Sequence, residues 1–176
     1  MKNYLGIGVL LLIVACNSEP KKSTNEQDTT TTKSTTAITD PSFKNDTVKA
    51  LYHSYIAVKD ALVATKYEDA KQKAKGLATE LKMVTGCENT SLIANKIENA
   101  KDIAEQRKQF TALSTDVIAL FKHAELTSGK IYIQHCPMAN KGDGGDWLSS
   151  EKKIQNPYYG SEMMECGAVI EEIKTK

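Results

Sequence analysis

The chain has 176 residues and a formal net charge of +1, a length that suits one domain with its own hydrophobic core. Lysine and arginine total 23 against 22 acidic residues, and Arg107 is the only arginine, so the charge gives no support for a nucleic-acid-binding protein. Hydrophobic residues make up 40% of the chain, but this average conceals three segments of very different composition.

Residues 1–15 are predicted to be a lipoprotein signal peptide. Lys2 gives a basic start, and the apolar run that follows, Leu5 to Val14, is too short to span a bilayer. Its end, Ile13-Val14-Ala15-Cys16, resembles the bacterial lipoprotein signal, in which the chain is cut before the cysteine and the cysteine receives a diacylglycerol and an N-acyl chain, such as palmitate. Such acylation of Cys16 predicts a membrane anchor facing the periplasm, on the inner or the outer membrane. The alternative is a short transmembrane anchor with an incidental cysteine.

Residues 16–40 are predicted to be a lipidated cysteine followed by a disordered tether. Positions 17–40 hold eight threonines, three serines and three lysines, and their only aliphatic side chains are Ala37 and Ile38. Such a segment buries too little apolar surface to offset the entropy of ordering it. We therefore expect a spacer between the lipid and a folded domain at residues 41–173.

Four amphipathic helices are predicted in the first part of this domain, because residues 43–128 contain no proline and only two glycines. The first has an apolar stripe from Val48 to Leu62 with Asp46 as its N-cap, and the others cover about residues 68–84, 90–101 and 103–123. We expect Gly86 to stop the second, Thr90 to cap the third, and Asp102 with Glu105 to form a capping box. The third and fourth could also be continuous. The predicted fold is mainly α, an antiparallel four-helix bundle.

A small irregular C-terminal lobe is expected at residues 129–167, where six of the ten glycines and the only tryptophan lie. One or two short strands are predicted, at residues 131–134 and within 168–173. Trp147, Tyr158 and Tyr159 are expected to form the core of the lobe. The glycine-rich loop at residues 140–146 contains Asp143 and Asp146, but it lacks the full spaced set of calcium ligands.

The candidate metal site combines His135-Cys136-Pro137-Met138 with Met163-Met164-Glu165-Cys166. In an extended chain, positions 136 and 138 project to the same side, and a helical turn or tight loop would present positions 163 and 166 together. Cysteine, methionine and histidine suit monovalent copper, whereas methionine is a poor zinc ligand. The predicted ligands of Cu(I) are the thiolates of Cys136 and Cys166, the thioethers of Met138 and Met163 or Met164, and His135 as an additional or alternative ligand.

Other interpretations of these residues remain open at this point. A structural disulfide between Cys136 and Cys166 would suit an oxidising compartment, and Met163 and Met164 would then fill gaps in a core. We expect Cys87 to be a buried or free thiol. His53 and His123 lie on predicted helices without a spaced partner and are expected to be surface or packing residues.

Three stretches of the chain resemble the domain of unknown function 3347 family: residues 52–64, 106–120 and 131–167, the last containing His-Cys-Pro-Met and Asn-Pro-Tyr-Tyr-Gly. The resemblance covers about residues 44–173. It implies a helical domain with an appended Cys/Met segment, found in lipoproteins and next to periplasmic adaptor subunits of heavy-metal efflux systems. Residues 136–138 are also similar to the Tyr-x-Cys-Pro-Met-His segments of copper-efflux adaptors, although Ala139 stands where those segments have histidine.

The sequence therefore predicts a non-enzymatic, lipid-anchored protein that binds a soft metal and buffers it or passes it to an efflux or maturation partner. The main alternative is an interaction module that binds another protein of the cell envelope and uses a Cys136–Cys166 disulfide as a staple. An enzyme ranks third, because the chain has no Cys-x-x-Cys, no serine-nucleophile elbow and no phosphate loop. A nucleophilic pair of Cys136 with His53 or His123 has only residue identity in its favour.

Overall fold

The computed structural model describes residues 40–176. The predicted signal peptide, Cys16 and all of the tether except its last residue lie outside the described residues. The helices are α1 (Asp46–Val63), α2 (Tyr67–Leu81), α3 (Glu88–Glu98) and α4 (Ile103–Lys122), and the strands are β1 (Ser42–Phe43), β2 (Leu126–Ser128), β3 (Lys130–Cys136), β4 (Gly145–Ser149) and β5 (Ala168–Lys174). Within residues 40–176, no helix has the length and apolar character needed to cross a membrane.

The four helices confirm the helical periodicity, but several of their ends differ from the prediction. Asn45 caps α1, because its side-chain oxygen accepts the N–H groups of Thr47 and Val48, and Asp46 is instead the first helical residue. Helix α3 begins at Glu88, so Thr90 lies inside it and donates its hydroxyl to Asp116. Helix α2 ends at Leu81, three residues before the predicted end.

The boundary between α3 and α4 is a real break. Residues 99–102 are not helical, so the alternative of one continuous helix is wrong. Asp102 caps α4 as expected, because its carboxylate accepts the N–H of Glu105 at 2.8 Å. The carboxylate of Glu105 accepts a hydrogen bond from Gln109 at 2.6 Å. The described contacts therefore contain one half of the predicted capping box.

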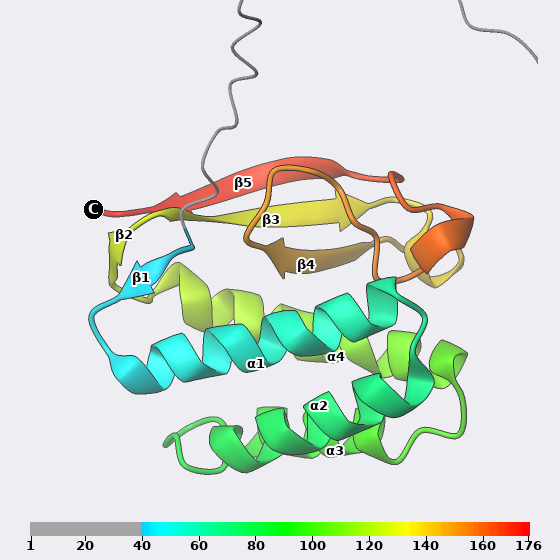
Figure 1. Cartoon of the computed structure of the whole chain (residues 1–176), viewed down its shortest axis with the longest axis horizontal. Helices are drawn as coiled ribbons and strands as arrows, with labels where there is room; N and C mark the ends of the chain where they lie inside the picture. Colours follow the sequence, from blue (N-terminus) through cyan, green and yellow to red (C-terminus); the bar gives the residue numbers. More distant parts are fainter. Residues whose placement is uncertain (1–39) are drawn as a thin grey trace, which may run out of the picture. The chain divides into compact units, whose positions relative to one another are not determined.

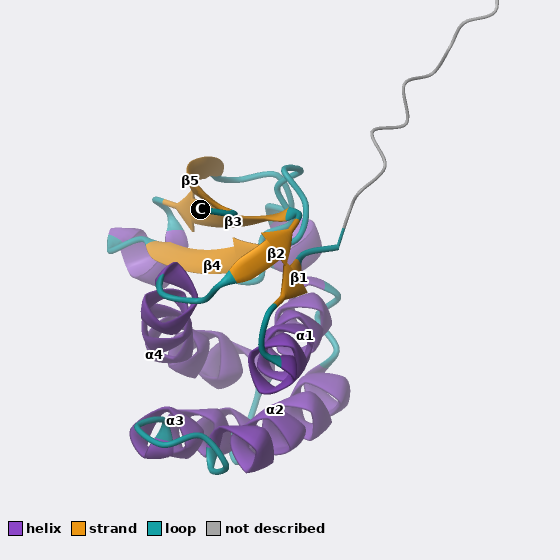
Figure 2. Ribbon diagram, turned by 90° about the vertical axis from the view of Figure 1, so that its left-hand side faces the viewer, coloured by secondary structure: helices purple, strands orange, loops and turns teal. Residues whose placement is uncertain are grey.

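The elements form layers in which α1 and α4 lie between the sheet and the α2–α3 pair (Figure 1). The three-stranded sheet is antiparallel with the order β4-β3-β5, and β1 and β2 form a separate two-stranded ribbon that Figure 2 shows beside α1. Strand β4 contacts both α1 and α4. The mainly α prediction is confirmed. Strands β3 and β5 cover the two predicted strand segments, and β1, β2 and β4 are strands that were not predicted.

One core joins the helices and the sheet. The hydroxyl of Tyr55 in α1 lies 2.7 Å from the Ser114 hydroxyl of α4 and accepts the main-chain N–H of Leu148 in β4 at 3.2 Å. Burial raises the pKa of Tyr55 far above its usual value, so it remains a neutral phenol. Trp147 is fully buried, and Tyr158 nearly so. The C-terminal part of the chain is therefore packed onto the helices rather than appended to them.

Strand β3 has two different faces. Its register with β4 pairs Cys136 with Gly145 and His135 with Asp146. Because side chains alternate along a strand, Cys136 shares a face with Gln134 and Trp147, and His135 points to the opposite face. Residues 150–167, here named the covering segment, run from β4 to β5, and Gln134 donates its amide to the carbonyls of Glu151 and Lys153 at 2.8 and 3.1 Å.

Candidate functional site

The structure brings together two of the predicted ligands, Cys136 and Cys166. Cys136 is the last residue of β3, and Cys166 lies at the end of the covering segment, just before β5. Their sulfur atoms are 3.2 Å apart and not bonded to each other. Cys136 is fully buried and Cys166 is half-buried. Contact with the Cys136 thiol, reinforced by burial, raises the pKa of Cys166 above the usual thiol value.

Asn156 fixes the main chain around Cys166. This asparagine is fully buried, and its side-chain amide donates to the carbonyl of Cys166 at 2.9 Å. Its main-chain N–H donates to the carbonyl of Met164 at 2.9 Å, and its side-chain oxygen accepts the N–H of Tyr158 at 2.8 Å. In the sequence, an Asn-Pro pair such as Asn156-Pro157 is typical of a turn. An asparagine that starts a turn commonly bonds the N–H two residues on, and this local signal was available in the sequence.

The Asn-Pro-Tyr-Tyr-Gly run is held against the end of α1 by Arg107. The guanidinium donates to the carbonyls of Pro157 and Leu62 at 2.9 and 3.1 Å and to the Thr65 hydroxyl at 3.0 Å. Burial lowers the pKa of Arg107. Gly160 has φ +58°, and a Cβ there would lie 2.5 Å from the Thr65 hydroxyl oxygen. The arginine and the glycine therefore dock the covering segment onto the helices.

His135 belongs to a second polar pair, on the other face of β3. Its Nδ1 lies 2.6 Å from a carboxylate oxygen of Asp146, and both side chains are partly exposed. In a neutral imidazole, a carboxylate at Nδ1 favours the tautomer with the proton on that nitrogen. Gly144 has φ +83°, and a Cβ there would lie 2.7 Å from the imidazole ring. The alternation of the strand therefore separates this imidazole from the thiols, although His135 and Cys136 are adjacent in sequence.

The three methionines take different positions. The extended geometry expected for residues 136–138 is wrong, because β3 ends at Cys136 and Met138 has helical φ/ψ in the turn that follows. Met138 is 53% exposed, whereas Cys136 is buried. Met163 and Met164 are half-buried, and the carbonyl of Met163 accepts the N–H of Cys166 at 3.1 Å. The predicted tight loop at residues 163–166 is therefore present.

The remaining candidate residues lie as expected or away from the thiols. His53 and His123 are exposed, and Cys87 is buried at the start of α3, where burial raises the pKa of its thiol. Trp147 and Tyr158 pack edge to face with ring centroids 6.0 Å apart, and Tyr159 is half-buried. Among the described residues, no three His, Cys, Asp or Glu side chains gather closely enough to hold a metal ion. The soft donors that do gather are the two thiols.

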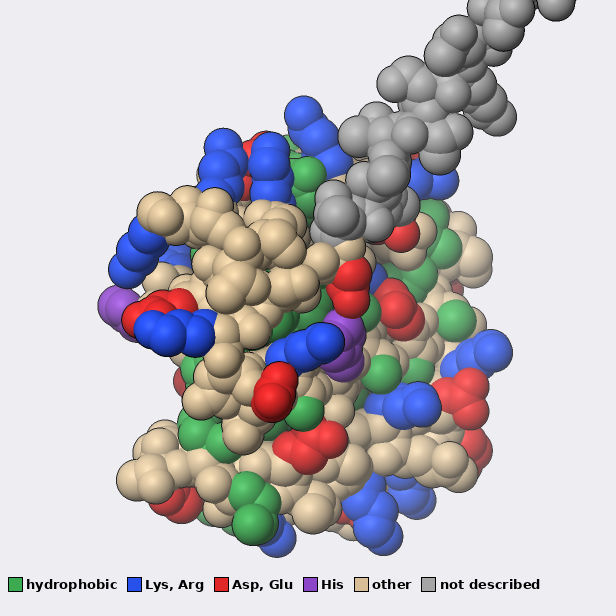
Figure 3. Space-filling model, turned by 60° about the vertical axis from the view of Figure 1, so that its left-hand side comes forward, with side chains coloured by type: hydrophobic (Ala, Val, Ile, Leu, Met, Phe, Trp, Pro, Cys, Tyr) green, Lys and Arg blue, Asp and Glu red, His purple; other side chains and the backbone are tan. Residues whose placement is uncertain are grey.

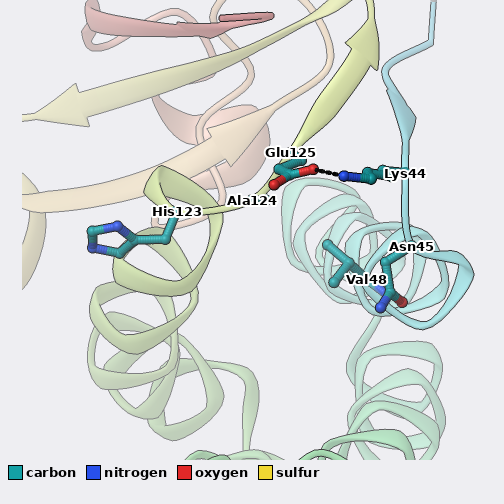
Figure 4. Close-up of a pocket in the computed structure, with 6 residues that line it drawn as sticks. All are labelled: Lys44, Asn45, Val48, His123, Ala124 and Glu125. Atoms are coloured by element: carbon teal, nitrogen blue, oxygen red, sulfur yellow. Dashed lines mark hydrogen bonds and ion pairs between the residues drawn. The ribbon is translucent and has the colours of Figure 1, made fainter.

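A pocket of about 420 Å³ lies elsewhere, between the start of α1 and the end of α4 (Figure 4). Lys44, Asn45, Val48, His123, Ala124 and Glu125 line it. Lys44 and Glu125 form an ion pair at 2.6 Å, which raises the pKa of the lysine and lowers that of the glutamate. None of the predicted metal ligands lines this pocket.

Comparison with known families agrees with the resemblance seen in the sequence. Residues 51–129 match the family model described as Protein of unknown function (DUF3347). The matched range runs from α1 to the turn after β2, so the paired thiols lie beyond it. No curated protein and no solved structure matches the chain.

Proposed function

We propose that this protein is a lipid-anchored, periplasm-facing binder of a soft metal, with Cu(I) as the metal and Cys136 and Cys166 as its thiolate ligands. The observation that carries the proposal is the 3.2 Å contact between their sulfur atoms, the one thiol–thiol contact among the three described cysteines. Thiolates are preferred ligands of Cu(I), and a metal bound here would release the thiol protons.

The donor set around the thiols suits a soft cation. Met163 and Met164 lie on the loop that ends at Cys166, so either thioether is a candidate third ligand. His135 lies on the opposite face of β3, and Met138 lies in the exposed turn that follows the strand. We therefore do not propose either residue as a ligand beside the thiols. No cofactor other than the metal is proposed, and we propose no enzymatic activity.

Handover is the use of the metal that the exposure of the ligands favours. Cys136 is buried, whereas Cys166 is half-buried and so open to an incoming ligand from a partner. A heavy-metal efflux adaptor or a maturation protein would exchange its own thiolate or thioether for Cys166. The lipoprotein signal ending at Cys16 supports the placement at the membrane, and the balanced charge gives no support for a nucleic-acid partner.

A second candidate function also draws on the thiol contact. In this alternative the protein is an interaction module of the cell envelope, and a permanent Cys136–Cys166 disulfide staples the covering segment to β3. Basic and acidic side chains are interspersed over the face shown in Figure 3, which favours no single class of charged partner. The metal test below separates the two candidates.

The test is an anaerobic titration of the reduced full chain in detergent with Cu(I), in competition with a chromogenic copper chelator. We expect the protein to withdraw about one equivalent of copper, because the two thiols form one site. The variant Cys136→Ser/Cys166→Ser should lose this withdrawal, and the matched variant Cys87→Ser should retain it. Unchanged withdrawal by the double variant would reject the metal proposal. No withdrawal by the wild type, with a mass two units below the dithiol form before reduction, would favour the interaction module.

A further inference from the structure

The sulfur atoms of Cys136 and Cys166 lie close enough for oxidation to a disulfide. A disulfide bond of about 2.05 Å is reached from the present contact by a shift of about 1 Å. The two cysteines are 30 positions apart in the sequence, but Cys136 ends β3 and Cys166 lies just before β5, the strand that pairs with β3. The third described thiol, Cys87, is buried at the start of α3, and no contact joins it to the pair. Oxidation within the described part of the chain would therefore link Cys136 to Cys166 specifically.

Asn156 holds the main chain around Cys166 in place without contacting either sulfur atom. Its side-chain amide bonds the carbonyl of Cys166, and its main-chain N–H bonds the carbonyl of Met164. Its side-chain oxygen is occupied by the N–H of Tyr158. Because these bonds involve only the amide of Asn156 and main-chain atoms, they persist whether the sulfurs carry protons or are joined. The scaffold is therefore compatible with both oxidation states.

The difference in exposure gives the two sulfurs different roles. Cys166 is half-buried, so an external disulfide reaches it first, whereas Cys136 is fully buried behind it. In thiol–disulfide exchange, one thiol attacks the external disulfide and a second, resolving thiol completes the reaction. The exposure order assigns the attacking role to Cys166 and the resolving role to Cys136.

We propose that Cys136 and Cys166 form a reversible dithiol–disulfide couple that exchanges with an external disulfide, and that Asn156 is the residue that positions it. The Cys166 sulfur, after loss of its proton, attacks the external disulfide, breaks its S–S bond and forms a mixed disulfide while one thiol leaves. The Cys136 sulfur then attacks the Cys166 sulfur, and the second thiol leaves with the remaining proton. Two electrons pass to the external disulfide, which becomes two thiols, and the new S–S bond removes both thiolate donors from any metal.

The experiment equilibrates the full chain in detergent, without metal, with mixtures of reduced and oxidised glutathione. Quenching with acid, alkylation and peptide mass mapping then report the free thiol at each cysteine. We expect Cys136 and Cys166 to lose their alkylation together in one transition that reverses with excess reduced glutathione. Two outcomes overturn the proposal: thiols that stay free at every ratio, and a disulfide that reduced glutathione does not open.

The role of Asn156 is tested with Asn156→Asp, which keeps the size of the side chain and removes the amide that donates to Cys166. A looser Cys166 segment spends less time in contact with Cys136, so the equilibrium constant for oxidation should fall at least tenfold. The matched control is Asn140→Asp, because the Asn140 amide donates in the same way to the Gly144 carbonyl at 2.8 Å, and its described hydrogen bonds go to Gly144 and Thr111 and not to the Cys166 segment. The control should stay within twofold of the wild type.

Stability is measured separately, so that a general loss of structure is not mistaken for a positioning effect. Urea unfolding of the reduced variants shows whether each one folds, and Asn156→Ser replaces Asn156→Asp if the buried carboxylate prevents folding. An equal shift of the equilibrium constant in the Asn156 and Asn140 variants would contradict the assignment to Asn156. A pair that oxidises reversibly but takes no copper from the chelator keeps this inference and rejects the metal-binding function, so the two failures are distinguishable.

Discussion

Gly160 is a residue at which the backbone and its surroundings both require glycine. Its φ of +58° disfavours an L side chain, and a Cβ would lie 2.8 Å from the Arg107 guanidinium as well as against Thr65. Arg107 bonds three groups, one in α1, one in the turn after α1 and one in the covering segment, so it has little freedom to move away. The docking of the covering segment therefore depends on the absence of a side chain at this one position.

We predict that Gly160→Ala lowers the free energy of unfolding by about 1–3 kcal/mol, because it combines backbone strain with overpacking. The matched control is Gly76→Ala on the exposed side of α2, where an added Cβ meets nothing within 4 Å. Alanine is the better helix former there, so the control should stabilise the protein by about 0.5–1 kcal/mol. Urea unfolding followed by circular dichroism measures both. Equal effects of the two substitutions would contradict this account of Gly160.

Among the residues of the candidate site, the two cysteines could be predicted from composition alone. Cysteine and methionine concentrate in two short runs, which is enough to select Cys136 and Cys166 as partners. The bonds by which Asn156 fixes the Cys166 segment are not visible in the sequence, because they go to carbonyl groups eight and ten residues further along the chain. The separation of His135 from Cys136 also needs the structure, since it follows only once β3 is known to continue to residue 136.

The start of α1 shows how a helix boundary is set by one side chain. Asn45 has extended backbone angles, and its side-chain oxygen accepts the N–H groups of Thr47 and Val48 at 2.8 and 3.2 Å. Asp46, which the sequence analysis favoured as the cap, lies in the first turn, where its negative charge faces the positive end of the helix dipole. The two neighbours therefore stabilise the same helix by different means.

We predict that Asn45→Ala destabilises the protein by about 1 kcal/mol, the usual cost of losing an N-cap. Asp46→Asn, which removes only a charge at an exposed helix start, should cost about 0.3–1 kcal/mol at low salt. Urea unfolding at low and high salt distinguishes the two effects, because salt screens the charge but not the cap. A greater loss of stability in Asp46→Asn than in Asn45→Ala, or equal salt dependence of the two losses, would show that Asp46 is the N-cap.

The strands were harder to predict than the helices for a physical reason. Each helix repeats its apolar positions over eleven or more residues, whereas β1 and β2 have only two and three residues and no periodicity to detect. Strand β4 begins with Gly145 and Asp146, two residues that are depleted in strands. Pairing with β3 and the burial of Trp147 and Leu148 override that local preference. Tertiary contacts, which the sequence pattern does not contain, decide such strands.

Across residues 40–176, the helices and the sheet share one core in spite of the change in composition near residue 129. Phe110 of α4 packs against Tyr55 of α1 and against Tyr158 of the covering segment, with ring centroids 5.5 and 5.9 Å apart. Tyr158 in turn contacts Trp147 of β4. The aromatic contacts and the Tyr55 hydrogen bonds therefore run from α1 through α4 to the sheet. A boundary that is clear in the sequence is absent from the packing.

This continuity predicts that the described domain unfolds as one cooperative unit. Far-ultraviolet circular dichroism reports the helices, and the fluorescence of Trp147, the only tryptophan in the chain, reports the sheet. In reduced protein, the two signals should give the same urea midpoint. Tyr55→Phe removes the hydroxyl that joins α1 to α4 and β4. It should lower the free energy of unfolding by about 1–3 kcal/mol and shift both signals to a lower urea midpoint together.

The control for this prediction is Tyr132→Phe, because Tyr132 is a half-buried tyrosine of β3 whose hydroxyl has no described role between the layers. This substitution should leave both midpoints close to those of the wild type and change the free energy of unfolding by no more than about 0.5 kcal/mol. A tryptophan transition at lower urea than the helical one would instead show that the sheet and the covering segment unfold first. The thiol pair would then open by local unfolding, and an external disulfide would reach Cys136 as readily as Cys166.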